Sequence, residues 1–319
     1  MSTLPAKTVK PLSSAADPAA LLTTSSSAQA AGPPSYPPTE VQKWLICPMF
    51  RHYSSVYRPR VEEWTPNRLV GSSIHAGIAA YLEAVRTGAA SPASPALGII
   101  ACEVLRKGYV EQETYKLAGL EALVTKGTNA LVRSVQTNLL PGATILGVEV
   151  VLKKNAPGPE PVPGQDHIAD CILQRDETLE VWDWKSSLRL DDAYLPDRLL
   201  EAHHSWQLLD YAYHAQALFS RPVSRVGQGL IILGPKTKVE YSPVPVTQER
   251  LDQWRRDAEV IWELMRAQSG GDMILSLWHN WAACSDKHLH FGKRCQFFEA
   301  CHTFMGNEGL FSALYRKVE

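Results

Sequence analysis

The residues best suited to chemistry lie in one short stretch, from Asp170 to Lys185, which reads DCILQRDETLEVWDWK. Two apolar runs, HIADCIL and TLEVWDWK, flank the polar turn QRDE and predict a β-hairpin. Alternation along the second strand places Asp183 and Lys185 on one face, and Trp182 and Trp184 on the other. Two carboxylates and a lysine so arranged could hold a divalent metal against a phosphodiester and activate a water molecule. A surface salt bridge is the alternative that these residues alone leave open.

The upstream acid of this hairpin has two candidates. Asp166 lies in the entering loop beside Gly164, whereas Asp170 is flanked by strand residues. Asp170 also lies across the expected hairpin from Asp183. We therefore favour Asp170 as the second carboxylate.

Two elements upstream of the hairpin carry further candidates. The β-branched run TILGVEVVLKK predicts a strand from Thr144 with Glu149 in its middle. A helix is expected from Thr65, its N-cap, to about Arg86, and it carries His75. Without further context, a solvated strand glutamate and a buried helical histidine are the ordinary interpretations of these two side chains.

Downstream of the hairpin, HHSWQLLDYAYHAQALF predicts a clear helix after a polar loop or short helix at residues 188–202. Gln207 and Tyr211 are i, i+4 neighbours on this helix and present an amide and a phenol together. A solvated helix face explains the same spacing. Gln207 and Tyr211 indicate a functional role only in combination with the charged residues of the hairpin.

The remaining pattern predicts an α/β fold with a central mixed sheet flanked by helices. Strands are expected near residues 145–152, 167–173, 179–185, 226–233 and 238–246. Helical periodicity appears in EVQKWLICPMFRHY, over residues 97–138 and in ERLDQWRRDAEVIWELMRAQ. Residues 1–39, rich in Ala, Ser, Thr and Pro, read as a disordered tail.

Composition excludes some classes of protein. The 319 residues are 45% hydrophobic and 20% charged, as in an ordinary soluble protein, and no apolar run approaches the roughly 20 residues of a membrane span. We see no signal peptide and expect a cytoplasmic protein without a membrane partner. The net charge of −1 gives no overall footprint for nucleic acid, so binding to DNA would depend on local patches.

Cysteine usage indicates a second kind of site. Cys284, Cys295 and Cys301 lie close together in a loop-rich segment with basic and aromatic residues. In an intracellular chain, such spacing favours metal ligation over disulfides. Cys47, taken alone, and Cys102 are most simply buried small hydrophobes.

With these residues assembled, the chain resembles the PD-(D/E)XK nuclease superfamily, and within it the RecB-like branch. That branch includes phage exonucleases, AddB-type helicase–nucleases and CRISPR-adaptation nucleases. It has a helical His, a strand Glu, an Asp in the first hairpin strand, Asp-x-Lys in the second, and Gln-x-x-x-Tyr on the next helix. The same order occurs here as His75, Glu149, Asp170, Asp183-Trp184-Lys185 and Gln207 with Tyr211.

This resemblance implies a restriction-endonuclease-like core and a metal-dependent DNA nuclease. An exonuclease of recombination, repair or phage DNA metabolism is expected first, with a recombination or replication protein as a further partner. A CRISPR-adaptation-type DNA-trimming nuclease, a non-catalytic DNA-binding iron–sulfur subunit and a structural iron–sulfur or zinc protein are the alternatives.

The resemblance also implies roles for the site residues. Mg²⁺ or Mn²⁺ would be held by Asp170, Asp183, the carbonyl of Trp184 and His75, with Glu149 completing or orienting the shell. Lys185 would orient the attacking water or help to deprotonate it. The remaining pair, Gln207 and Tyr211, would contact the DNA phosphate or support the lysine.

The iron–sulfur members of the branch have one cysteine before the nuclease core and three after it. Cys47, Cys284, Cys295 and Cys301 match that layout and imply a 4Fe–4S cluster, with Zn²⁺ as the alternative; the wide Cys284–Cys295 gap departs from some members. A helical cap would carry the cluster. The expected organisation is a nuclease domain at residues 40–304, with cluster-bearing segments 41–60 and 280–304, and a C-terminal extension at 305–319.

Overall fold

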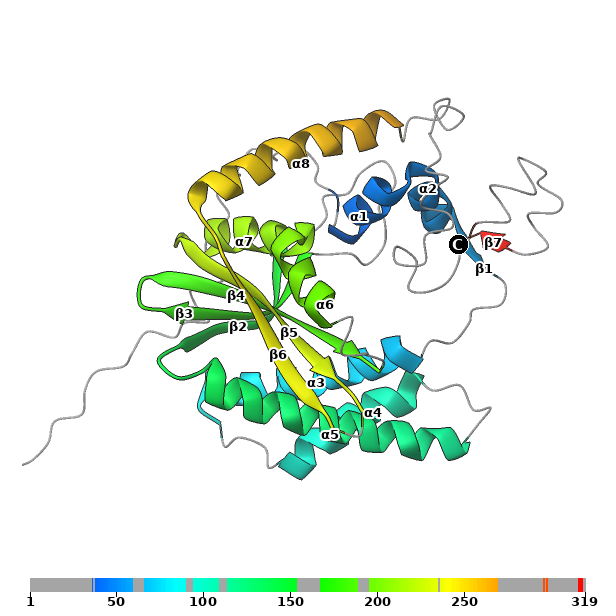
Figure 1. The fold of residues 1–319 in the computed structure, drawn as a ribbon, viewed down its shortest axis with the longest axis vertical. Helices are drawn as coiled ribbons and strands as arrows, with labels where there is room; N and C mark the ends of the chain where they lie inside the picture. The colour runs from blue at the N-terminus through cyan, green and yellow to red at the C-terminus, as the bar shows by residue number, and fades with distance from the viewer. Residues whose placement is uncertain are drawn as a thin grey trace, which may run out of the picture. The chain divides into compact units, whose positions relative to one another are not determined.

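The structure, a computed structural model, describes residues 36, 38–59, 66–89, 94–108, 114–153, 167–188, 195–234, 236–268, 295, 297 and 315–317. A five-stranded sheet with the order β2-β3-β4-β5-β6 forms the centre (Figure 1). Its strands are β2 (Thr144–Lys153), β3 (His167–Arg175), β4 (Thr178–Ser187), β5 (Val223–Ile232) and β6 (Lys238–Pro245). Neighbouring strands are antiparallel except β4 and β5, which are parallel. The mixed sheet and α/β class predicted from the sequence are confirmed.

Helices cover both faces of this sheet (Figure 1). They are α1 (Pro38–Ile46), α2 (Pro48–Val56), α3 (Pro66–Thr87), α4 (Ser94–Gly108), α5 (Thr114–Asn138), α6 (Leu195–Glu201), α7 (Trp206–Phe219) and α8 (Gln248–Gln268). On one side, α3 and α5 pack against the sheet and α4 packs against these two helices; α7 packs against the other face. In the part of the chain that the structure describes, no helix combines the length and hydrophobicity of a membrane span.

The alternation of β4 divides the core in two. Trp182 and Trp184 lie with the buried residues of α3, α4 and α5, such as Ile74. Val181 lies on the opposite face with the buried residues of α7, such as Leu208. Each fully buried aliphatic side chain contributes roughly 1.5–3 kcal/mol to folding, so both faces of the hairpin are held firmly.

The two tryptophans of β4 also determine how β5 can pair with it. In the parallel register, Trp182 is opposite Gly227 and Trp184 is opposite Gly229. A Cβ atom on Gly227 would lie 2.4 Å from the ring of Trp182, and one on Gly229 would lie 2.6 Å from the ring of Trp184. Glycine is therefore required at both positions of β5, because the indole rings lie over its backbone.

The connection from β4 to β5 positions α7. Parallel strands cannot be joined by a tight turn, and here α6, a short 3₁₀ helix at Ala202–His204, and α7 make the crossover. Ser205 is the N-cap of α7, and its side chain accepts a hydrogen bond from the amide of Leu208 at 3.2 Å. The first turn of α7, which contains Gln207, is thereby fixed over the end of β4.

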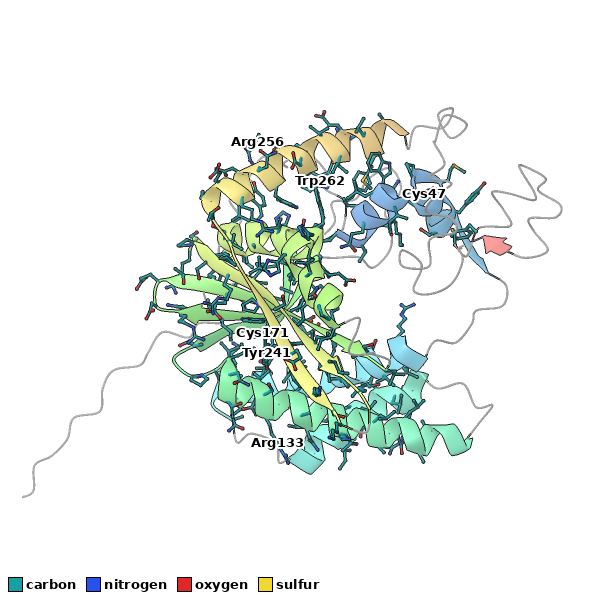
Figure 2. The ribbon with its side chains drawn as sticks, viewed as in Figure 1. Cys47, Arg133, Cys171, Tyr241, Arg256 and Trp262 are labelled. Carbon is teal, nitrogen blue, oxygen red and sulfur yellow. The ribbon has the colours of Figure 1, made fainter. Side chains whose placement is uncertain are left out.

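The N-terminal helical segment differs from the single short helix that its sequence suggests. It forms two helices, because Pro48 lacks an amide donor and begins α2 directly after Cys47. Trp44 of α1 packs with Trp254 and Trp262 of α8 (Figure 2 labels Trp262 and Cys47). These contacts place α1 and α8 beside α7.

A second, two-stranded sheet joins the segment that follows α2 to the last described residues. Strand β1 (Tyr57–Pro59) pairs with β7 (Tyr315–Lys317) in antiparallel fashion. Close by in sequence, the ring of Tyr53 lies 5.5 Å from that of Phe297, centroid to centroid. The predicted tail lies outside the described residues up to residue 35, and α1 begins at Pro38.

Candidate active site

The two strands of the hairpin stay joined beyond their last backbone pair through a side chain. The described ladder between β3 and β4 ends at Cys171 and Trp182. One residue further, Oδ2 of Asp170 accepts a hydrogen bond from the backbone amide of Trp184 at 2.7 Å. A carboxylate thus takes the place of a carbonyl acceptor, which holds Asp170 against β4. Its rival, Asp166, lies outside the described residues.

The face of β4 turned towards α7 carries a chain of polar contacts. Nζ of Lys185 lies 2.8 Å from Oδ2 of Asp183 and donates to Oε1 of Gln207 at 3.3 Å. Nε2 of Gln207 in turn donates to the hydroxyl oxygen of Tyr211 at 2.6 Å. Asp183 is only 2% exposed, so the pair is not the surface salt bridge that the sequence left open.

His75 reaches the same hairpin from α3. Its Nε2 lies 2.8 Å from the carbonyl oxygen of Trp184, and its Nδ1 lies 3.6 Å from Oδ2 of Asp170. The carbonyl and the imidazole predicted as ligands are therefore adjacent.

Glu149 stands beside Asp170 on the neighbouring strand. Val148 pairs with Cys171 and Val150 with Ala169, so the register places Glu149 opposite Asp170. Its φ of 50° lies in the left-handed region, which is uncommon for any residue other than glycine and especially within a strand. Non-glycine residues held in this region cluster at functional sites.

The acids of the site raise one another's affinity for protons. Burial and the charge of Asp183 raise the pKa of Asp170 to about 7, although His75 and the amide of Trp184 oppose that rise. Glu149 is exposed as a whole, but partial removal of its carboxylate from water raises its pKa, which His75 lowers and Asp183 raises again. Burial, followed by the charge of Asp183, raises the pKa of the Tyr211 phenol. A cation at this point would relieve the repulsion.

The donor set fits a hard divalent cation. One ligand atom from each of His75, Glu149 and Asp170 lies within 4.8 Å of the other two. Carboxylate and carbonyl oxygens with a single imidazole suit Mg²⁺ or Mn²⁺. Asp183 stands outside this group of three and pairs with Lys185, yet its charge acts on both Asp170 and Glu149.

The predicted cysteine ligands are described only in part. Cys47 and Cys295 are buried, whereas Cys284 and Cys301 lie outside the described residues. Cys102 and Cys171 are buried in the core, as expected for Cys102.

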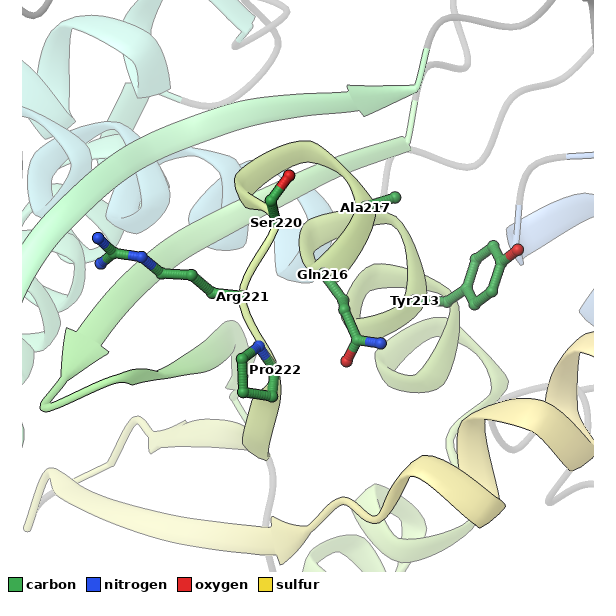
Figure 3. A pocket seen from close by; sticks show the side chains of 6 residues that line it. All are labelled: Tyr213, Gln216, Ala217, Ser220, Arg221 and Pro222. Atoms are coloured by element: carbon green, nitrogen blue, oxygen red, sulfur yellow. The ribbon is translucent and has the colours of Figure 1, made fainter.

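A pocket at the end of α7 contains none of the predicted site residues (Figure 3). It is lined by Tyr213, Gln216, Ala217, Ser220, Arg221 and Pro222. This pocket is therefore separate from the point where the acids and the lysine meet. A separate buried group, His167, Asp210 and His214, was missed in the sequence, where the i, i+4 spacing of Asp210 and His214 was its one visible signal.

A family model of the PD-(D/E)XK nuclease superfamily matches residues 36–302. The chain belongs to this superfamily. Members are mostly nucleases and typically use Mg²⁺ or Mn²⁺, which indicates a metal-dependent nuclease that binds DNA. The resemblance inferred from the sequence is confirmed at the level of the superfamily.

Other comparisons add little to this assignment. A search of curated proteins finds no match to the chain. Among solved structures, the crystal structure of SSO0001 aligns with 70% of this chain and 86% of its own length, at 13% sequence identity and a TM-score of 0.20.

Proposed function

We propose that the protein is a metal-dependent deoxyribonuclease that hydrolyses phosphodiester bonds as an exonuclease, from single strands or duplex ends, in recombination, repair or phage DNA metabolism. One observation carries the catalytic part of this proposal. The ammonium of Lys185 is paired with buried Asp183 on the strand next to Asp170, whose carboxylate meets His75 and Glu149. A lysine ammonium and a hard-cation donor set thus meet at one end of the hairpin.

The cation would be held by Asp170, Asp183, His75 and the carbonyl of Trp184, with Glu149 completing or orienting its shell. When bound, Mg²⁺ or Mn²⁺ neutralises charge on the scissile phosphate and lowers the pKa of a water molecule. Asp170 is already placed by its hydrogen bond from Trp184. It needs only to lose its proton to act as a ligand.

Lys185 would orient the attacking water and balance the charge that develops on the phosphate. Gln207 supports this role, because its side-chain oxygen accepts from Nζ while its amide donates to Tyr211. The lysine is therefore held between Asp183 and α7. We assign Gln207 and Tyr211 to positioning Lys185 first, and to contacting a DNA phosphate second.

Digestion of end-labelled linear DNA and covalently closed circular DNA, with Mg²⁺ or Mn²⁺, tests this function. Loss of linear DNA from its ends with intact circles is expected, and Asp183→Ala or Lys185→Ala should abolish it. Glu177→Ala, an exposed acid in the turn of the same hairpin, is the matched control and should retain full activity. Cleavage of the circular DNA would show that the protein is an endonuclease and not an exonuclease. Full activity in either site variant would overturn the catalytic assignment.

We further propose that Cys47, Cys284, Cys295 and Cys301 hold a 4Fe–4S cluster, with Zn²⁺ as the alternative. Support comes from the two cysteines that the structure describes, which are both buried. The contact between Tyr53 and Phe297 also brings their two segments together. The cluster would be structural, since it would join segments more than 200 residues apart in the chain.

Spectroscopy of the protein purified without oxygen tests the cluster. Absorbance near 400 nm (roughly where such clusters absorb) with about four iron atoms per chain is expected. Cys47→Ser should lose both signals, whereas Cys102→Ser should keep them. Stoichiometric zinc without iron would support the alternative, and the absence of both metals would overturn the site.

A further inference from the structure

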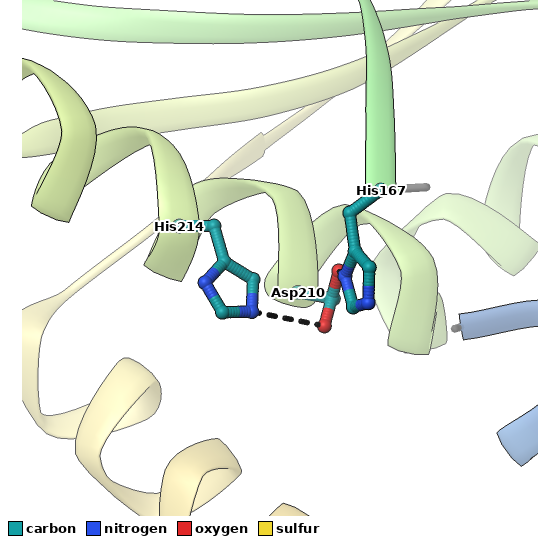
Figure 4. A group of neighbouring side chains, drawn as sticks. All are labelled: His167, Asp210 and His214. Carbon is teal, nitrogen blue, oxygen red and sulfur yellow. Dashed lines mark hydrogen bonds and ion pairs between the residues drawn. The ribbon is translucent and has the colours of Figure 1, made fainter. Parts of the chain in front are cut away.

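Three buried side chains that take no part in the proposed nuclease chemistry meet where β3 begins beside α7 (Figure 4). His167 and Asp210 have no exposed surface, and His214 is 8% exposed. One ligand atom from each lies within 4.8 Å of the other two. We infer that His167, Asp210 and His214 form a second metal site, which binds Zn²⁺ and is structural.

The donor chemistry distinguishes this site from the candidate active site. Two imidazoles and one carboxylate suit Zn²⁺, whereas the active-site group has one imidazole among oxygen donors. Three protein ligands leave the fourth position of a tetrahedral ion to a water molecule. Zn²⁺ also outranks Mg²⁺ and Mn²⁺ in affinity for nitrogen-rich sites.

The backbone supplies the spacing that such a site requires. Asp210 and His214 lie one turn apart on α7, and Oδ1 of Asp210 is 3.6 Å from Nε2 of His214. Two ligands of a tetrahedral zinc ion lie about 3.4 Å apart, since each is about 2.0–2.1 Å from the metal. The helix therefore already presents two ligands at nearly the right separation.

The contact between His167 and Asp210 shows what the ion would replace. Nδ1 of His167 lies 2.5 Å from Oδ2 of Asp210, which is the distance of a strong hydrogen bond. Zn²⁺ would take the place of the proton between them, the proton would pass to solvent, and the two atoms would separate by about 1 Å. Metal binding should accordingly release protons.

Aromatic rings surround the three side chains. The ring of His214 lies edge-on to His167 at 5.1 Å and to Tyr213 at 5.3 Å, and Trp254 follows at 6.5 Å. These aromatic rings fix the orientations of the imidazoles and keep the local dielectric low, which strengthens the attraction between the Asp210 carboxylate and a bound cation.

The position of the cluster gives the ion a structural role. His167 is the first residue of β3, three residues before Asp170, and Asp210 directly precedes Tyr211 on α7. An ion here would join the strand that carries Asp170 to the helix that carries Tyr211. It would brace the candidate active site without contacting substrate.

Zinc titration of the full-length chain tests this inference. The protein is stripped with a chelator, and Zn²⁺ alone is titrated into wild type, His214→Gln and His204→Gln while heat and proton release are followed. His204 is exposed on the neighbouring 3₁₀ helix, which makes it the matched control. His214→Gln should bind one zinc ion fewer per chain and lose most of the zinc-dependent rise in melting temperature, whereas His204→Gln should match wild type.

X-ray absorption at the zinc edge identifies the atoms that bind the ion. It therefore distinguishes this site from the candidate active site and from the cysteines. In a His75→Ala background loaded with one equivalent of Zn²⁺, scattering from two imidazoles is expected. Sulfur scattering alone would assign the zinc to the cysteines and overturn the inference, as would equal zinc stoichiometry in wild type and His214→Gln. This measurement decides the question even if His214→Gln does not fold. Because nuclease activity is not a readout, its loss or presence leaves the result unaffected.

Discussion

Nζ of Lys185 lies 2.8 Å from Oδ2 of Asp183, two residues earlier on the same strand. The carboxylate is buried, while the lysine side chain is 37% exposed, so the ammonium enters from the solvent side and neutralises a charge that water cannot reach. The residue proposed to act on water therefore also supports folding. Its removal should have two separable effects.

Lys185→Ala should lower the free energy of unfolding by about 1–2 kcal/mol, less than for a fully buried pair because the lysine is partly solvated. The double variant with Asp183→Asn should recover part of that loss, since no uncompensated charge remains. Urea denaturation without divalent metal measures both. Lys107→Ala, at an exposed position in α4, is the control. Equal stability of the two lysine variants would contradict the coupling.

The pKa of Asp170 makes the metal-free protein sensitive to pH. Its pKa is about 7 when folded against an ordinary value of 3.8, so between about pH 4 and pH 7 the folded chain holds a proton that the unfolded chain has released. Stability should therefore fall as pH rises through this window and level off above it. Asp170→Asn should flatten the dependence in urea titrations. An unchanged slope in that variant would assign the proton to another group.

The same proton opposes metal binding. A divalent cation needs the carboxylate form, so the apparent Mn²⁺ affinity should rise roughly tenfold per pH unit up to about pH 7 and then level off. Isothermal titration at several pH values, with proton release measured in two buffers, checks this. Affinity that does not change between pH 5.5 and about 7 would show that Asp170 is not a ligand.

The left-handed backbone of Glu149 predicts that Glu149→Gly is more stable than Glu149→Ala by about 1 kcal/mol, because glycine adopts φ near 50° without the steric cost that alanine has there. Both variants should lose Mn²⁺ affinity to a similar extent. Thermal unfolding of the two variants measures the effect of backbone strain on stability, and metal titration measures the effect of the lost carboxylate on affinity. Equal stability of Glu149→Ala and Glu149→Gly would show that the backbone strain is absent in solution.

Gly227→Ala should destabilise the protein by about 1–3 kcal/mol, since its Cβ would lie 2.4 Å from the ring of Trp182 and force β4 and β5 apart. Gly234→Ala is the matched control, because nothing lies within 4 Å of its Cβ. Chemical denaturation of both compares them directly. A loss of nuclease activity beyond the loss of folded protein is also expected, since Asp183 lies between the two tryptophans on β4.

Sequence patterns predicted the sheet well because alternation and β-branched runs report local geometry directly. The five expected strands all occur, and the opposite faces of Asp183 and Trp184 follow from a period of two. The left-handed φ of Glu149 could not be predicted, since the β-branched run around it is typical of an ordinary extended strand. The break before α2 follows from Pro48, which lacks an amide donor and cannot continue α1.

Long-range pairing limited the prediction of the sites. His167 and Asp210 are 43 residues apart, and only the packing of α7 on β3 brings them together. Likewise, the contact between His75 and the carbonyl of Trp184 joins residues 109 apart. The order of motifs located the acids, yet it carried no information on which of them would share a ligand group and which would pair with the lysine.

The hydrogen bond from the amide of Trp184 to Asp170 has a consequence for the entropy of metal binding. A free aspartate must give up rotamer freedom when it binds an ion, and that loss subtracts from affinity. Here the side chain is already fixed as part of the sheet, because it occupies an acceptor position at the end of the ladder. The side chain of Asp170 therefore loses its rotamer entropy when the protein folds. Metal binding does not lose it again, so this entropy loss does not lower the affinity for the cation.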